Sequence, residues 1–598
     1  MNDQPRPPFA RVLIANRGEI AVRIARACRE LGCLAVAVYG AGEEDAAHVR
    51  AADEAYRLAS DAPLPYLDGE AVIAAARQAG AQAVHPGYGF LSENAGFAEA
   101  CAAAGLVFVG PPAAAIRAMG EKIASREIAA AAGVPVVPGS DGPVATPEEA
   151  AAAAERIGYP VAIKASGGGG GRGFRVARSA AELPEAFAGA SGEATRSFAN
   201  PDVYLERYLE RPRHVEMQVI GGPDGQIVVP GERDCSIQRR HQKLVEETPA
   251  PHFQPETRAR MAEAAAALAR AVGDRNAGTV EFILAADGAF YFLEMNTRIQ
   301  VEHPVTELVT GIDLVKEQIG VAAGLPLSFT QEDVRPRGHA IECRINAEDP
   351  GRGFAPSPGT LSACREPGGF GVRVETAMAA GAAILPQYDS MIAKLAVWGR
   401  DRDEAIARMA RALAEYEVAG VATTIPFHRN VMAHPAFRAG DVSTAFIPEH
   451  PEVIPPPFAG AAAGAGEDRS PETRDLVAEV NGRRFAVRLV GAGLGGSGAR
   501  SGGGGNTGAS RAGGAARRAG ASRMPASDGP EVASPIQGTV VRIVAEAGAA
   551  VARGDVLLVV EAMKMENEIA AHRDGTLEAV LAEIGAAVKI GDVVARIG

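Results

Sequence analysis

The stretch VAIKASGGGGGRGF, residues 161–174, says most about how this 598-residue chain folds. The apolar run at residues 161–163 predicts a buried strand, and the five glycines at 167–171 predict a hairpin loop whose return strand begins at Phe174. Because glycine has no Cβ, several backbone N–H groups of such a loop can approach a polyphosphate. No GK[ST] follows, so this is not a Walker A loop. We expect phosphate binding, although a flexible linker would have a similar composition.

Lysine is scarce in this chain, since only seven of its 60 basic residues are lysines. Sites that merely need positive charge therefore use arginine. An ammonium can be acylated or can approach a phosphate as a compact point charge, so lysines are expected where chemistry occurs. Random compositional drift is the alternative for any single one of the seven: Lys122, Lys164, Lys243, Lys316, Lys394, Lys564 and Lys589.

Carboxylates gather downstream of the glycine run. Glu281 is followed by YFLEMNTRIQVEH, which supplies four more candidate site residues: Glu294, Asn296, Arg298 and Glu302. Two carboxylates at strand ends and an amide oxygen are hard ligands suited to Mg²⁺ bound to ATP phosphates. Arg298 adds a cation and Glu302 a candidate base. A charged edge strand is the alternative, and the glycine-rich loop upstream argues against it.

The first 120 residues have the pattern of a parallel α/β sheet. Apolar runs predict strands at residues 11–15, 34–39 and 83–85, and periodicity predicts helices ending near Leu31 and spanning 71–79. His85-Pro86-Gly87-Tyr88-Gly89 follows the third strand, at the sheet edge where ligands usually bind. Residues 120–325 mix strands and short helices, and residues 336–448 form a further α/β block.

Composition changes after the proline run at residues 455–457. Apolar alternation at 477–480 and 484–489 around Asn481-Gly482 predicts a type I′ hairpin. From residue 491 to 529 the Gly/Ser/Ala/Arg sequence offers almost nothing to bury, which predicts disorder.

The C-terminal segment contains an internal repeat. Residues 538–556 match residues 575–593 at a constant offset of 37, with eleven identities in nineteen positions. Two copies of one strand-rich unit predict a β sandwich with pseudo-twofold symmetry. The centre between the copies falls at 565–566, inside Glu-Ala-Met-Lys-Met-Glu-Asn, so Lys564 is expected at a hairpin tip.

Bulk properties exclude several classes of protein. The net charge of −13 with no basic stripe argues against nucleic acid as a partner. The six cysteines lack metal-site or disulfide spacing, and no segment has the pattern of a signal peptide or membrane span. We therefore expect a cytoplasmic protein with no membrane partner.

Met-Lys-Met at the symmetric turn of a duplicated β domain resembles the biotin attachment signature, here preceded by Ser-Pro-Ile-Gln-Gly at residues 534–538. Lipoyl domains share the fold and the exposed lysine, but their lysine usually lacks both flanking methionines. The resemblance therefore implies biotin bound covalently to Lys564.

The glycine-rich loop resembles the lid of the ATP-grasp family, and residues 9–447 resemble biotin carboxylases throughout. Matching stretches include GERDCSIQRRHQKLVEE at residues 231–247 and ECRINAEDP at 342–350. The implied fold is a multidomain α/β protein followed by a small all-β biotinyl domain. Its expected domains are a biotin carboxylase N-terminal domain (9–120), an ATP-grasp domain with lid (121–330), a biotin carboxylase C-terminal domain (335–447), a linker with a short hairpin (448–529) and the biotinyl domain (530–598).

The resemblance also implies roles for individual residues. ATP would be bound by Lys122, Lys164, Gly169, Gly170, Gly171, Glu206, Leu209, His214, Gln238 and His241. Magnesium or manganese would be held by Glu281, Glu294 and Asn296. Bicarbonate would meet Lys243, Arg298 and Val301, with Glu302 as base and Arg344 facing the biotin ureido oxygen. Arg207 replaces a lysine common in the family, a change expected to matter little because that neighbour contributes mainly backbone contacts.

The implied function is ATP- and bicarbonate-dependent carboxylation of biotin on Lys564. The product would serve a separate carboxyltransferase β subunit that acts on acetyl-CoA or propionyl-CoA, as in actinobacterial α subunits of acyl-CoA carboxylases and in fatty acid biosynthesis. Biotin protein ligase would attach the biotin, and a homo-oligomer of the carboxylase within a larger hetero-oligomer is expected.

Two alternatives remain. The biotin carboxylase subunit of a two-subunit pyruvate carboxylase has the same motifs. An ATP-binding carrier that has lost catalysis is disfavoured, because no expected charged residue is missing.

Overall fold

The first sheet confirms the parallel α/β pattern. The computed structural model describes residues 7–62, 64–140, 142–165, 175–198, 203–459, 472–480, 483–491, 529–534, 538–562, 565–588 and 591–598. Five strands lie in the order β3-β2-β1-β4-β5, and the pairings between neighbours are all parallel. They are β1 (Arg11–Ile14), β2 (Leu34–Tyr39), β3 (Glu54–Arg57), β4 (Ala83–His85) and β5 (Val107–Phe108). The helices between them are α1 (Gly18–Glu30), α2 (Ala47–Ala51), α3 (Gly69–Gln78), α4 (Ala95–Ala103) and α5 (Ala113–Gly120).

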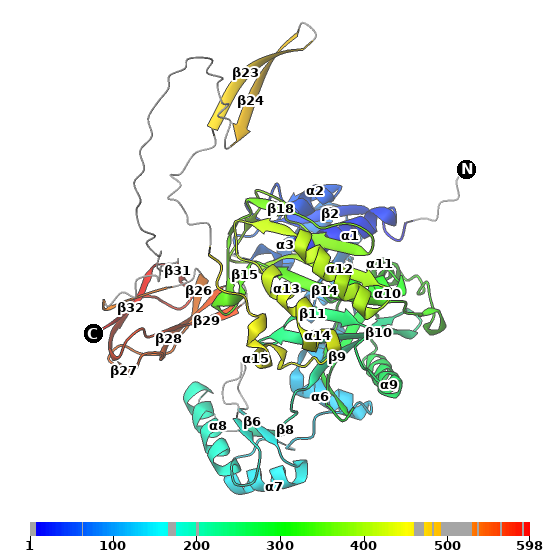
Figure 1. The fold of residues 1–598 in the computed structure, drawn as a ribbon. Coiled ribbons are helices and arrows are strands. Elements are labelled where there is room, and N and C mark those ends of the chain that lie inside the picture. Colours follow the sequence, from blue (N-terminus) through cyan, green and yellow to red (C-terminus); the bar gives the residue numbers. More distant parts are fainter. Residues whose placement is uncertain are drawn as a thin grey trace, which may run out of the picture. The chain divides into compact units, whose positions relative to one another are not determined.

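A small sheet carries the glycine-rich stretch. Its order is β7-β6-β8, with β6 (Val161–Ala165), β7 (Arg175–Ala177) and β8 (Val203–Arg207). The helices α7 (Pro147–Ile157) and α8 (Leu183–Phe198) lie beside this sheet (Figure 1), and their apolar side chains share one core cluster with its strands. The strands on either side of the glycines are thus paired as predicted, whereas the glycines at 167–171 lie outside the described residues.

One eight-stranded sheet runs through the regions assigned from the sequence to the ATP-grasp and C-terminal domains. Its order is β13-β12-β9-β10-β11-β14-β21-β19. Antiparallel pairing of β11 with β14 joins the two regions into one continuous sheet. The strands are β9 (Arg213–Gly221), β10 (Ile227–Arg239), β11 (Gln242–Thr248), β12 (Asn276–Leu284), β13 (Phe290–Asn296), β14 (His339–Asn346), β19 (Val372–Thr376) and β21 (Met391–Gly399).

Helices cover this sheet and bury its apolar side chains. Met261 and Leu268 of α9 (Pro255–Ala271) pack with Met217 and Phe282 in one core cluster, and Ile406 and Met409 of α12 (Arg402–Glu415) pack with β14 and β21 in another. The remaining helices of this part are α6 (Lys122–Ala131), α10 (His303–Thr310), α11 (Leu314–Ala322), α13 (Ile425–Ala433), α14 (Pro435–Ala439) and α15 (Phe446–Glu449). Among the described residues, no helix combines the length and apolar character needed to cross a membrane.

The C-terminal residues form a second compact unit. Two four-stranded sheets have the orders β25-β32-β30-β27 and β29-β28-β26-β31. Adding or subtracting the repeat offset converts one order into the other, which confirms the predicted pseudo-twofold sandwich. The strands are β25 (Glu531–Ala533), β26 (Gly538–Ile543), β27 (Ala550–Val551), β28 (Val556–Ala562), β29 (Met565–Ala570), β30 (Gly575–Val580), β31 (Ala587–Val588) and β32 (Val593–Ile597).

Backbone hydrogen bonds repeat the same symmetry. Val540 N donates to Ala586 O, and its counterpart Leu577 N donates to Ala549 O, each at 2.9 Å. Neighbouring strands β28 and β29 end and begin on either side of the Met-Lys-Met motif, while Met563 and Lys564 themselves lie outside the described residues.

The hairpin predicted in the linker is also present and is longer than predicted. Its strands are β23 (Glu472–Val480) and β24 (Arg483–Gly491). The turn Asn481-Gly482 and the stretch 492–528, for which the sequence predicts disorder, lie outside the described residues.

Candidate active site

A cavity of about 1500 Å³ collects most of the residues singled out from the sequence. Its lining includes fourteen of them: Lys164, Glu206, Leu209, His214, Gln238, His241, Lys243, Glu281, Glu294, Asn296, Arg298, Val301, Glu302 and Arg344. Lys122 begins α6, but its side chain is not described; Gly169, Gly170, Gly171 and Lys564 lie outside the described residues.

At one end of the cavity, Lys164 and Glu206 extend from neighbouring strands of the small sheet. The Lys164 ammonium contacts one Glu206 carboxylate oxygen, and Arg126 of α6 donates to the other at 2.6 Å. Burial alone would raise the pKa of Glu206, but Lys164 and Arg126 hold it below its usual value. Lys164 thus lies directly beside the glycine-rich stretch with its ammonium in the cavity.

Three glutamates occupy one row across three neighbouring strands, and two of them, Glu294 and Glu281, line the cavity. Glu294 of β13 pairs in register with Glu281 of β12, which pairs with Glu216 of β9. Like charges directly opposite one another destabilise a sheet, so this row requires cations. Arg233 of β10, fully buried, continues the row and donates from its Nε to Glu216 at 2.5 Å.

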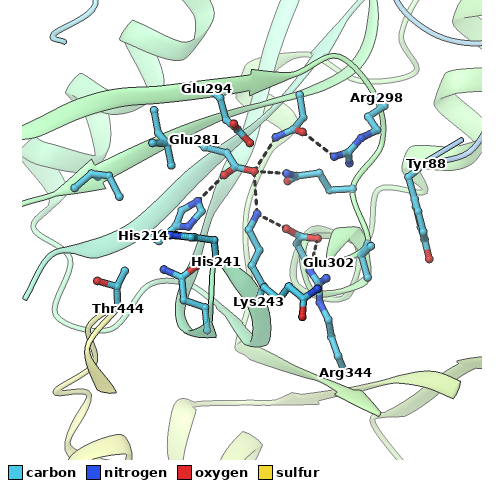
Figure 2. Close-up of a pocket in the computed structure, with 18 of the residues that line it drawn as sticks. Tyr88, His214, His241, Lys243, Glu281, Glu294, Arg298, Glu302, Arg344 and Thr444 are labelled. Carbon is cyan, nitrogen blue, oxygen red and sulfur yellow. Dashed lines mark hydrogen bonds and ion pairs between the residues drawn. The ribbon is translucent and has the colours of Figure 1, made fainter. Parts of the chain in front are cut away.

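Lys243 of β11 is the central cation of the site (Figure 2). Its Nζ lies 2.5 Å from Glu216, 2.9 Å from Glu281 and 2.6 Å from Glu302. Burial opposes a charge here, but these carboxylates outweigh burial and raise the pKa of Lys243 well above its usual value. His214 adds a second contact to Glu281 at 2.7 Å, and its pKa is likewise raised by Glu281 against burial.

Glu302 lies between two cations. Its carboxylate accepts hydrogen bonds from Lys243 at 2.6 Å and from Arg344 at 3.0 Å, and the Arg344 Nε donates to Glu246 at 2.6 Å. Burial alone would raise the pKa of Glu302, but Lys243, Arg344 and Arg233 hold it well below its usual range. Glu302 is also the N-cap residue of α10, where the positive end of the helix dipole favours a negative charge.

The predicted metal ligands have the donors that a hard divalent cation needs. The Glu294 carboxylate lies in the cavity, and among the described residues no hydrogen bond or ion pair to it is seen. Burial and the neighbouring Glu281 raise the pKa of Glu294, and a cation between the two carboxylates would relieve both effects. Asn296 lines the same cavity; it donates to Glu281 at 2.7 Å, and its side-chain oxygen accepts from Arg298 at 2.7 Å. The oxygen donor set therefore fits Mg²⁺ or Mn²⁺.

Four charged residues of the site were not predicted from the sequence. Glu216 contacts Lys243 and Glu246 contacts Arg344 from inside buried strands, Arg233 pairs with Glu216, and Glu93 accepts from Arg298 at 2.7 Å. Glu216 had a detectable signal, because it is a carboxylate between the apolar residues Val215 and Met217 in a strand that is almost entirely buried. Glu93 had none, since its role depends on a loop from a distant part of the chain.

Family comparisons match most of the chain in four blocks. Residues 8–116 match the biotin carboxylase N-terminal domain, 121–330 the carbamoyl-phosphate synthase L chain ATP-binding domain, 342–449 the biotin carboxylase C-terminal domain, and 530–597 the biotin-requiring enzyme family.

Individual proteins match over long stretches. A pyruvate carboxylase subunit of Methanothermobacter thermautotrophicus is 54% identical over 74% of this chain and 90% of its own length. The biotin-dependent acyl-coenzyme A carboxylase alpha3 subunit of Mycobacterium leprae is 46% identical over 94% of both chains. The biotin carboxylase domain dimer of Hydrogenobacter thermophilus 2-oxoglutarate carboxylase, solved with MgADP, ADP and bicarbonate, is 51% identical over 75% of this chain and 99% of that chain, with a TM-score of 0.68.

Proposed function

The chain belongs to the biotin carboxylase family and carries a biotinyl domain, and from this premise we propose that it carboxylates biotin on its own Lys564 for a separate acyl-CoA carboxyltransferase. The observation that carries the proposal is the Lys243–Glu302–Arg344 chain of ion pairs, beside the Glu281 and Glu294 carboxylates in one cavity.

ATP binding is proposed for one end of this cavity. Lys164 and Lys122 would neutralise phosphate charge, and the backbone N–H groups of Gly169, Gly170 and Gly171 would close over the phosphates. Glu206, Leu209, His214, Gln238 and His241 would contact the rest of the nucleotide. Glu281, Glu294 and Asn296 would hold the metal, which when bound neutralises charge on the transferred phosphoryl group.

Bicarbonate is proposed to bind between Lys243, Arg298 and Val301. While it is paired with Lys243 and Arg344, Glu302 is a weak base. A bicarbonate anion would pair with Lys243 and displace Arg344 from Glu302. The pKa of Glu302 would then rise, because these two cations would no longer stabilise its carboxylate. Glu302 would then accept the bicarbonate proton as a bicarbonate oxygen attacks the γ-phosphorus and ADP leaves, giving carboxyphosphate.

Carboxyphosphate decomposes to CO₂ and phosphate, and exclusion of water by the closed loop would prevent wasteful hydrolysis. Attached biotin supplies the ureido nitrogen that accepts the carboxyl group, and the N1 proton would leave to the phosphate. Arg344 would contribute by facing the ureido oxygen, where negative charge develops.

The acceptor is proposed to be acetyl-CoA or propionyl-CoA. Support comes from the mycobacterial acyl-CoA carboxylase subunit, which matches through the carboxylase and the carrier, whereas the match to the pyruvate carboxylase subunit covers 74% of the chain. Pyruvate remains the second candidate, since that relative has the higher identity. Co-purification of the carboxyltransferase, followed by assay with a panel of acyl-CoA thioesters and pyruvate, distinguishes them.

Further partners complete the proposal: biotin protein ligase, a carboxyltransferase β subunit, and a second copy of the chain, as in the dimer of the Hydrogenobacter domain. A cytoplasmic location suits ATP and bicarbonate as substrates. The primary test is ADP release by the purified chain with free biotin. ADP release must depend on bicarbonate; ADP release without bicarbonate dependence would contradict the proposal.

A further inference from the structure

Lys394 on β21 is fully buried. A lysine is almost never placed this deep unless its ammonium is paired, because removing a charge from water is costly. Its Nζ donates to the backbone oxygen of Val301 at 3.0 Å and lies 3.1 Å from a Glu19 carboxylate oxygen. One buried cation thus connects β21, the loop before α10 and the first turn of α1.

Tyr88 extends this group into the cavity. Its hydroxyl donates to the second Glu19 carboxylate oxygen, and its ring centroid lies 5.6 Å from Lys394 Nζ. Tyr88 itself lines the cavity, and in Figure 2 it is drawn on the same side of the view as Arg298 and Glu302. Glu19 and Tyr88 therefore hold the ammonium from one side while Val301 accepts from it on the other.

The carbonyl that Lys394 holds belongs to the peptide bond between Val301 and Glu302. The adjacent strands β14 and β21 place Arg344 and Lys394 directly opposite each other. Two cations in that relation repel one another, so each needs its own partner. Arg344 donates to the Glu302 carboxylate, and Lys394 donates to the Val301 carbonyl oxygen. Side chains from two paired strands therefore hold residues 301 and 302 at two points.

From these contacts, and resting on the proposed function, we propose that Lys394 is a positioning residue: it fixes the Val301–Glu302 peptide so that the Glu302 carboxylate meets bicarbonate in the orientation needed for proton transfer.

The competing role for Lys394 is merely to neutralise Glu19. Burial raises the pKa of Glu19 to about 7 even with Lys394 opposing, so Glu19 has no need of a fixed cation once it is protonated. If neutralisation were the whole role, removal of both charges would restore activity. If Lys394 positions Val301, the double variant stays impaired because the carbonyl has still lost its donor.

The test compares Lys394→Met, the double variant Glu19→Gln/Lys394→Met and the control Lys316→Met in the full biotinylated chain. Lys316 is another of the seven lysines, is partly exposed, and pairs with Glu30 and Asp313 away from the cavity. Kinetics with free biotin give kcat/KM for bicarbonate and KM for ATP, and thermal unfolding reports the fold.

We expect kcat/KM for bicarbonate to fall about 10- to 100-fold in both Lys394 variants, the loss that a misplaced reacting group typically causes. KM for ATP should stay within about twofold, and Lys316→Met should match the wild type. Recovery of the double variant to within about threefold of the wild type would overturn the proposal. So would an equal rise in KM for ATP, or loss of cooperative unfolding in the double variant. Failure of the proposed function is distinguishable, because the wild type would then show no bicarbonate-dependent turnover.

Discussion

Replacing Glu302 by glutamine separates the contribution of Glu302 to catalysis from its contribution to the stability of the fold. Glutamine keeps the shape and one acceptor, but its amide N–H₂ faces a cation, so one charge-assisted hydrogen bond is lost at a cost of about 1.5–3 kcal/mol. Lys243 keeps Glu216 and Glu281, and Arg344 keeps Glu246, so no cation is left unpaired. The free energy of unfolding, about 5–15 kcal/mol for a typical domain, should therefore remain positive.

The catalytic activity of Glu302→Gln should be affected much more strongly than its stability. Losing a general base typically costs about 10²- to 10⁴-fold, or about 3–5 kcal/mol of transition-state stabilisation. The assay is bicarbonate-dependent ADP release with free biotin, alongside ATP affinity by calorimetry. ATP affinity should stay within about threefold of the wild type, because Glu302 belongs to the proposed bicarbonate end of the cavity.

Glu247→Gln is the matched control. Glu247 is buried on β11, next to Glu246, and its carboxylate is also held by two side chains, His339 at 2.8 Å and Arg402 at 2.7 Å, but it does not line the cavity. It should lower stability comparably and leave turnover within about twofold. Wild-type turnover in Glu302→Gln, or equal losses of turnover in both variants, would refute the assignment of Glu302 as the base.

Three further predictions concern other parts of the chain. Lys564→Arg should abolish biotinylation by a biotin ligase, and a remaining avidin-blot signal would contradict the assignment. Deleting residues 495–525 should leave free-biotin carboxylation unchanged but lower coupled acyl-CoA turnover several-fold, because the linker of about forty residues, if flexible as its composition predicts, would span roughly 35 Å; unchanged coupled turnover would rule out a tether. Asp274 is buried with no cation beside its carboxylate among the described residues, and burial, opposed only by the backbone N–H of Arg275, raises its pKa to about 8. Its folded pKa thus exceeds the unfolded value of about 3.9, so its stability contribution is lost as pH rises toward about 8. Asp274→Asn should raise the melting temperature at pH 8 more than at pH 5, and parallel pH profiles would contradict this.

Local sequence signals predicted the elements well wherever the cause of the structure is local. Apolar runs placed β2 and β4 at their observed bounds, and the 37-residue repeat predicted the symmetry of both C-terminal sheets. Scarcity of lysine correctly drew attention to Lys164 and Lys243, both of which extend into the cavity.

Features that depend on strand register could not be predicted in the same way. The row Glu294–Glu281–Glu216 forms only when three strands pair in one register, and nothing local in the sequence sets that register. Lys394 and Glu19 belong to opposite ends of the carboxylase region, and their pairing requires the whole region to fold. The pairing of β11 with β14, which carries one sheet across the boundary predicted near residue 330, likewise depends on register.

The most direct test of the central claim uses labelled bicarbonate. The full biotinylated chain is incubated with ATP, Mg²⁺ and [¹⁴C]bicarbonate, separated from small molecules at alkaline pH, and counted. The account predicts protein-bound label that approaches the biotin content, requires ATP, and is absent from Lys564→Arg. Absence of protein-bound label in the wild type, or label that persists in Lys564→Arg, would contradict it.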